Sequence, residues 1–155
     1  MAHPGSPLIP HDITPAELRR EGAPRLRVTI HDAAGIAGVR RMVRDMVGID
    51  MSPQRRSDVL LAVTELVTNS LVHAGPGPVT VWAWLDANRL RVEVHDAGPW
   101  IPADHDWTLP LDGTRGGGRG LALVRMIADR SGHRALPSAK VWFEMDMPTS
   151  GNGRH

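Results

Sequence analysis

The sequence predicts an α+β fold, a two-layer α/β sandwich whose helices cover one face of a mixed, mostly antiparallel sheet. Strand and helix patterns follow one another in the order β-α-α-β-β-loop-α-β, which suits a sheet covered on mainly one side. The chain has 155 residues, of which 41% are hydrophobic, so it can bury one core. We expect a flexible N-terminal arm over residues 1–24, a folded domain over 25–148 and a disordered tail over 149–155.

The expected arm is rich in proline, and the first strand and helix follow it. Residues 25–31 (RLRVTIH) alternate between polar and apolar side chains, as a half-buried strand does. Residues 33–49 then place apolar side chains at the spacing of one helix face. The arm carries few apolar residues and many helix breakers, namely Pro4, Pro7, Pro10, Pro15 and Pro24.

The clearest element is a long helix from Ser52 to about Ala74. Serine as the N-cap and Pro53 at the first helical position make a good helix start. No glycine or proline interrupts the segment until the Gly-Pro-Gly-Pro run over 75–78, which ends it.

A hairpin, a long loop and a final helix and strand complete the domain. Residues 79–85 and 89–96 flank a short turn and therefore predict a hairpin. Residues 98–117 are rich in proline, glycine and aspartate, and a loop of this length is usually functional or disordered. A helix from 118 to about 130 and a strand over 140–147 follow.

Composition excludes several classes of function. Eighteen basic and seventeen acidic residues leave a net charge of +1, so we expect no nucleic-acid partner. Without cysteine there is no disulfide framework, thiolate metal site or cysteine nucleophile. No run approaches the roughly 18 apolar residues of a membrane span, so we expect a cytoplasmic chain without a membrane partner.

Three polar residues form a stripe along the long helix. Glu65, Asn69 and His73 are spaced by four, and at about 100° per residue they fall on one side of the helix. The stripe borders the apolar face, so a carboxylate and a carboxamide lie at the margin of the core. The pattern is typical of a polar site, or of a half-exposed polar edge.

A carboxylate also faces the core at the end of the strand over 89–96. Asp96 shares the apolar side of that strand with Leu90, Val92 and Val94 by the period of two. A buried carboxylate needs hydrogen-bond donors, and the exocyclic amine of a base would be suitable. Alternatively, Asp96 caps its own turn.

A glycine-rich string opens the last predicted helix. Glycines at this place let the backbone approach an anion, and the helix N-terminus presents unpaired N–H groups to it. The string is no Walker A motif, because no Lys-Ser/Thr pair follows, and a flexible hinge is the alternative. It comprises Gly116, Gly117, Gly118, Arg119, Gly120 and Leu121.

In combination, these features resemble the GHKL (histidine-kinase-like) ATPase superfamily. The Glu-x3-Asn-x3-His helix, the Asp-x-Gly turn, the long loop and the Gly-x-Gly-Leu helix look like its N box, G1 box, lid and G2 box. The resemblance covers about residues 25–148. The strings TELVTNSLVHAG and GGGRGLALV are most similar to small bacterial anti-sigma-factor serine/threonine kinases and their stand-alone ATP-binding relatives.

The resemblance implies the Bergerat fold, with ATP held between the helices and the lid. It implies that Asp96 accepts a hydrogen bond from adenine and that Asn69 offers an oxygen to Mg²⁺. Glu65 would be the base that takes a proton from a serine hydroxyl. The implied phosphate-side contacts are His73, Gly98, the charge-neutralising Arg115 and Arg119, and the amides of Gly116, Gly117, Gly118, Gly120 and Leu121.

Two positions depart from the family pattern. The first glycine motif of the family usually reads Asp-x-Gly-x-Gly, but Trp100 stands in place of its second glycine. The Gly-Thr pair that commonly precedes the last strand is replaced by Ser138-Ala139-Lys140. Both departures put nucleotide affinity in question.

Two main hypotheses therefore stand. In the first, the chain is an ATP-dependent kinase that phosphorylates an antagonist protein on Ser/Thr and also binds a sigma factor. In the second, it is a binding module of the same fold that sequesters a partner, with weak or absent nucleotide binding. A detached sensor-kinase domain is a third reading, and the resemblance makes a homodimer one possible assembly.

Overall fold

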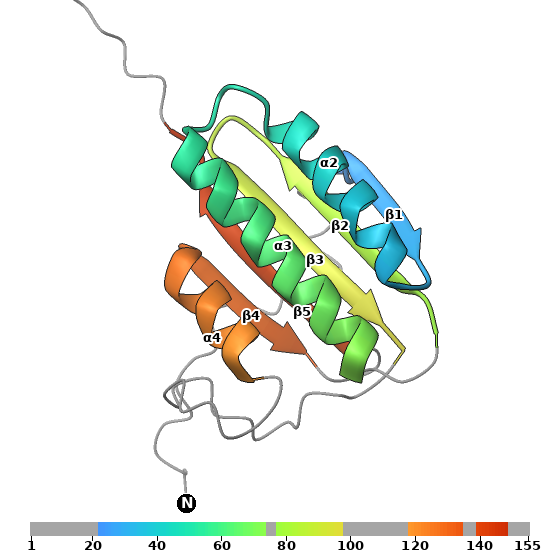
Figure 1. Ribbon diagram of the computed structural model, residues 1–155. Coiled ribbons are helices and arrows are strands. Elements are labelled where there is room, and N and C mark those ends of the chain that lie inside the picture. The colour runs from blue at the N-terminus through green and yellow to red at the C-terminus, as the bar shows by residue number, and fades with distance from the viewer. Residues whose placement is uncertain (1–21, 74–76, 98–117, 135–138, 149–155) are drawn as a thin grey trace, which may run out of the picture.

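The computed structural model describes residues 22–73, 77–97, 118–134 and 139–148. A five-stranded sheet forms one layer, and the helices form the other (Figure 1). The elements are β1 (Leu26–Ile30), the short 3₁₀ turn η1 (Ala33–Gly35), α2 (Ile36–Val47), α3 (Pro53–His73), β2 (Val79–Leu85), β3 (Arg89–Asp96), α4 (Gly118–Ile127), β4 (Arg130–Arg134) and β5 (Ala139–Asp146).

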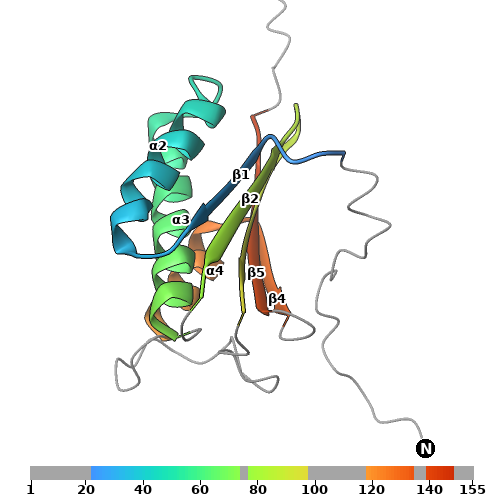
Figure 2. The ribbon, with the colours of Figure 1, turned by 90° about the vertical axis from the view of Figure 1, so that its right-hand side faces the viewer.

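The sheet has the strand order β1-β2-β3-β5-β4, and all four of these pairings are antiparallel. Seen along the sheet, α2, α3 and α4 all lie on the same side (Figure 2). This arrangement confirms the predicted two-layer α+β fold, with helices on one face of the sheet.

The core lies between the two layers. The helices contribute a stripe of buried apolar side chains, and every second residue of the central strands faces them, as the period of two requires. Fully buried examples are Val63 and Leu66 of α3, Val81 of β2, Val92 of β3 and Phe143 of β5.

The starts of the first two helices follow from their local sequence. Asp32 accepts a hydrogen bond from the amide of Ala34 (2.9 Å), so the predicted helix over 33–49 begins with the turn η1 and continues as α2. At the next helix, Ser52 Oγ accepts from the amide of Arg55 (3.2 Å). This bond confirms Ser52 as the N-cap of α3.

The structure adds one strand that the predicted order lacks. The last helix ends at Ile127 instead of about residue 130, and residues 130–134 pair with β5 as β4. The string RSGHR has no apolar alternation, so periodicity could not reveal it. Tertiary contacts hold it, because Arg130 bonds to Glu144 (2.6 Å) and to Asp146.

The other predicted strands and helices agree with the structure to within a few residues. The expected arm up to residue 21, the loop over 98–117 and the tail over 149–155 lie outside the described residues. Within the described part of the chain, no helix combines the length and the apolar character needed to cross a membrane.

Candidate functional site

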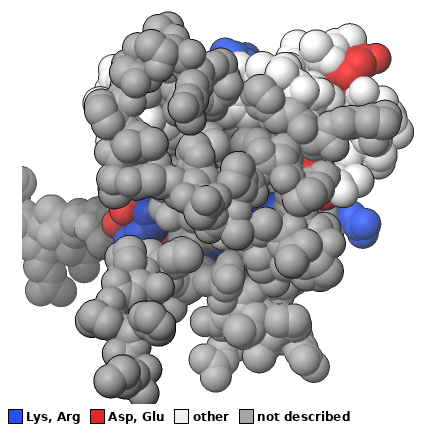
Figure 3. All heavy atoms as spheres, turned by 90° about the horizontal axis from the view of Figure 1, so that it is seen from below, with Lys and Arg blue, Asp and Glu red and all other residues white. Residues whose placement is uncertain are grey.

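Three of the segments singled out in the sequence end or begin at the same end of the molecule. The C-terminal ends of α3 and β3 and the N-terminal end of α4 lie together at the bottom of Figure 1, and Figure 3 views the molecule from this end. Helix α3 packs against both α4 and β3. The fold therefore brings Asn69, Asp96 and Gly118 to one end, although they lie far apart in the sequence.

Helix α3 places an amide and a hydroxyl near this end. Asn69 is 7% exposed, and Ser70 is completely buried in line with the apolar stripe of α3. Within the described part of the chain, neither Asn69 Nδ2 nor Ser70 Oγ has a hydrogen-bond partner. A buried donor without a partner costs about 1–3 kcal/mol, so Asn69 is the kind of group that a bound acceptor would satisfy.

Asp96 is the last residue of β3, and it is buried with 6% exposure. It shares the helix-facing side of the strand with Leu90, Val92 and Val94, as the alternation predicts. Its neighbour His95 faces the other side of the sheet, where it bonds to Glu93 (2.8 Å). Asp96 and His95 therefore do not form a dyad.

The residue opposite Asp96 on β5 is Ala139. It belongs to the Ser138-Ala139-Lys140 string that replaces the usual Gly-Thr of the family pattern. Lys140, the next residue, lies opposite His95 and is 1% exposed. The strand position beside Asp96 is consequently held by a residue that has no hydroxyl group.

The other predicted site residues divide into three groups. Glu65 lies on α3 one turn before Asn69 and is half-buried, and His73 is the last residue of the same helix. Gly118, Arg119 and Gly120 form the first turn of α4, and the Leu121 side chain packs into the core at 3% exposure. Those outside the described residues are Gly98, Arg115, Gly116 and Gly117.

Comparison with known families gives a match to the histidine kinase-like ATPase domain over residues 17–139, which is most of the chain. This chain belongs to that family. No curated protein matches it. The two glycine-motif segments and α3 all fall inside the matched range.

Histidine kinase-like ATPase domains bind ATP together with Mg²⁺, and the described residues of this chain fit such a ligand. The unpartnered amide nitrogen of Asn69 suits a phosphate oxygen, while its carbonyl oxygen is a ligand type that Mg²⁺ accepts. The buried carboxylate of Asp96 suits an amino donor of a base. Among the described residues, no group of three or more His, Asp or Glu side chains could hold a metal ion.

Sequence reasoning missed a buried polar cluster on the sheet face away from the helices. Arg91, Glu93, Lys140 and Glu144 are at most 4% exposed there. Their alternation in β3 and β5 is typical of a solvent-facing side, so it gave no signal of burial. Within this cluster the pKa of Glu93 is about 2. Burial would raise that pKa, but the hydrogen bond with His95 and the charges of Arg91 and Lys140 outweigh it.

Proposed function

We propose that this member of the histidine kinase-like ATPase family is a regulatory protein of the anti-sigma-factor type. It transfers the terminal phosphate of Mg-ATP to a serine or threonine hydroxyl of an antagonist protein, leaving ADP and a proton, and it sequesters a sigma factor. The family indicates protein partners, and the similarity of TELVTNSLVHAG and GGGRGLALV to anti-sigma kinases supports this choice among them.

One observation carries the proposal. Asn69 Nδ2 is buried without a partner in the described part of the chain, on the helix that also carries Glu65. That helix ends beside the end of β3, where Asp96 is buried (Figure 1). A phosphate oxygen bound at this place would supply the hydrogen bond that the buried amide lacks.

Each residue has a role that its chemistry allows. Glu65 accepts the proton of the attacking hydroxyl, and it is half-buried, so a substrate hydroxyl can approach it. Asn69 offers its side-chain oxygen to Mg²⁺ and its side-chain nitrogen to a phosphate oxygen. Asp96 selects adenine by accepting a hydrogen bond from the amino group of adenine. When bound, Mg²⁺ spreads the charge that develops on the transferred phosphate.

The glycine-rich turn and the nearby cations act on the phosphates. The amides at the start of α4, from Gly118 to Leu121, present the unpaired N–H groups of a helix N-terminus. Arg115 and Arg119 neutralise phosphate charge, Gly98, Gly116 and Gly117 let the backbone approach, and His73 closes the phosphate side.

Transfer of labelled phosphate from Mg-ATP to a candidate antagonist protein tests the proposal. Glu65→Gln keeps the size of the side chain and removes the base, so we expect nucleotide binding to persist and transfer to be lost. Asp58→Asn, on the same helix, is the matched control and should transfer normally. Normal transfer by Glu65→Gln would rule out its role as the base.

A second candidate function is favoured by Ala139. Because the residue opposite Asp96 lacks a hydroxyl, adenine has one possible partner fewer than the family pattern provides. In this reading the chain is a binding module of the same fold that holds its partner without phosphorylating it. Calorimetric titration with Mg-ATP separates the two functions, since the module would give no binding heat at high micromolar protein.

A further inference from the structure

The sheet face that points away from the helices, here called the outer face, carries three tryptophans. Trp82 and Trp84 lie two residues apart on β2, and Trp142 lies two strands away on β5. None of the described helices covers this face (Figure 2). Nevertheless Trp84 is only 6% exposed and Trp142 only 2%. A sheet face without helices is normally solvated, so burial of large aromatic side chains here requires an explanation.

The three indole rings are held in fixed positions. The rings of Trp82 and Trp84 have centroids 5.8 Å apart, and the Arg91 guanidinium lies 4.2 Å from the centroid of Trp142. Trp142 also lies across Gly132 of β4, where an added Cβ would come within 2.7 Å of the indole. The three indoles and their neighbours therefore form an aromatic platform on the outer face.

The charges among the rings are largely paired with one another. Arg91 donates to Glu93 (2.8 Å) and to Glu144 (2.9 Å), and the Lys140 ammonium lies 3.7 Å from Glu93. Among the strand residues whose side chains the structure describes, the register places five cations and three carboxylates on this face. These are Arg27, Arg89, Arg91, Arg130 and Lys140 against Glu93, Glu144 and Asp146.

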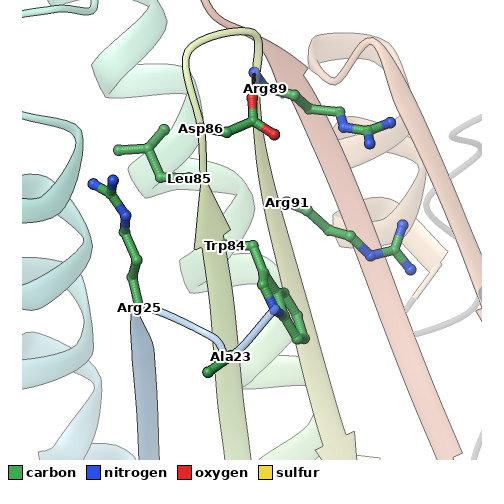
Figure 4. Close-up of a pocket in the computed structure, with 7 residues that line it drawn as sticks. All are labelled: Ala23, Arg25, Trp84, Leu85, Asp86, Arg89 and Arg91. Carbon is green, nitrogen blue, oxygen red and sulfur yellow. Dashed lines mark hydrogen bonds between the residues drawn. The ribbon is translucent and has the colours of Figure 1, made fainter. Parts of the chain in front are cut away.

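The chain itself already approaches this platform. The Trp84 indole N–H donates to the carbonyl oxygen of Gly22 (3.1 Å), and residues 22–25 turn from β1 toward the outer face (Figure 2). Beside this bond is a pocket of about 130 Å³ between Ala23, Trp84 and Arg91 (Figure 4). Trp82 Nε1 is also buried, yet it has no acceptor within the described part of the chain. An indole donor of this kind is suited to a further backbone carbonyl.

The segment that precedes Gly22 has the composition to supply that carbonyl. Residues 4–15 contain Pro4, Pro7, Pro10 and Pro15, and proline-rich segments bind aromatic-lined surfaces in the extended polyproline conformation. At about 3.1 Å per residue, six residues extend roughly 19 Å. Two strand spacings separate Trp84 from Trp142, about 10 Å, so the segment can span the platform.

Charge also favours this segment as the occupant. Residues 4–15 carry one acidic residue, Asp12, and no lysine or arginine. Within residues 4–15, the one negative charge of Asp12 thus meets an outer face on which the described cations outnumber the carboxylates. From the tether at Gly22, the unpartnered donor of Trp82, the proline content and the charges, we propose that residues 4–15 dock on the outer face as an intramolecular ligand. Trp82 Nε1 then donates to one of their carbonyl oxygens.

A fluorescent label on the full-length chain tests this docking. The chain has no cysteine, so Ser6→Cys can be labelled at one position with bimane, which tryptophan quenches on contact. We expect quenched fluorescence in the folded chain. The added Pro7→Gly/Pro10→Gly pair should abolish the quenching while every indole stays in place. Pro78→Gly, before the start of β2 and so at the opposite end of that strand from Trp84, is the matched control and should leave the quenching unchanged.

Two further variants locate the contact. Trp142→Phe should reduce the quenching, whereas Trp107→Phe, outside all the strands of the platform, should not. Trp82→Phe removes the indole donor that is proposed to hold residues 4–15. The neighbouring Arg19 and Arg20 should then be more accessible, so trypsin should cut there faster than in Trp107→Phe. The proposal is wrong if the native chain shows no quenching, or if quenching survives the paired proline substitution. It is also wrong if quenching weakens on dilution together with a dimer seen by ultracentrifugation, because a second copy would then be the occupant.

Discussion

Asp96, the last residue of β3, lies directly opposite Ala139, the first residue of β5. This pairing places the buried carboxylate beside a residue without a polar side chain, at the end of the molecule where α3 ends. The sequence showed only that the Gly-Thr pair of the family pattern is missing. The strand register shows that Ala139, one of the residues in its place, lies opposite Asp96.

We expect Ala139→Thr to strengthen ATP binding. A threonine hydroxyl opposite Asp96 adds a hydrogen-bonding group at the strand position that faces it, and a threonine is well tolerated in a strand. One added hydrogen bond of about 0.5–1.5 kcal/mol corresponds to roughly 2- to 13-fold tighter binding by calorimetry. Ala139→Val has nearly the same shape without the hydroxyl and is the control. Equal gains in both variants would attribute the effect to packing.

Asp96→Asn should weaken ATP binding strongly while the fold is retained. An amide in place of the carboxylate loses a hydrogen bond to a charged acceptor, which is worth about 1.5–3 kcal/mol, or roughly 10- to 150-fold in affinity. Calorimetric titration with Mg-ATP measures the loss. Asp45→Asn, at an exposed carboxylate of α2, should bind as the native chain does. Unchanged affinity in Asp96→Asn would show that Asp96 does not bind the adenine of ATP.

A side chain at Gly132 should destabilise the protein. An added Cβ would come within 2.7 Å of the Trp142 ring, and overpacking of this kind costs about 1–3 kcal/mol. Urea denaturation of Gly132→Ala measures the free energy of unfolding. Gly38→Ala is the opposite case. Gly38 lies inside α2, and no atom lies within 4 Å of the Cβ that alanine would add there. Alanine there should stabilise the helix by up to about 1 kcal/mol. The same sign for both variants would contradict the structure.

The stability of the protein should fall with acid through Glu93. Its pKa is lowered from 4.5 to about 2 in the folded chain, so the folded state favours the ionised form. The resulting stabilisation, on the order of 3 kcal/mol, is fully present above about pH 4.5 and is lost as the pH falls toward 2. Denaturation at a series of pH values should show this decline.

Glu93→Gln tests the assignment of that decline. The variant removes one carboxylate from the buried cluster that holds Arg91 and Lys140, so it should be less stable than the native chain at neutral pH. The difference should shrink as acid protonates Glu93 in the native chain. If the difference in the free energy of unfolding between the two proteins stays constant from neutral pH to pH 2, another group governs acid unfolding.

Elements with local signals could be predicted from the amino-acid sequence. Ser52 and Pro53 start α3, the four-residue spacing places Glu65 and Asn69 along one side of it, and alternation turns Asp96 toward the helices. Caps, helical periods and strand alternation act over a few residues, so they can be interpreted without knowing the rest of the fold.

Features that depend on residues distant in the sequence became visible only in the folded chain. Strand β4 exists because Arg130 and Gly132 meet Glu144, Asp146 and Trp142 of β5, and nothing within RSGHR indicates those contacts. The register that sets Asp96 opposite Ala139 is likewise a property of two strands more than forty residues apart. So is the burial of the outer-face side chains, because it depends on neighbours from adjacent strands, such as Arg91 and Gly132 around Trp142, that the alternation of one strand does not reveal.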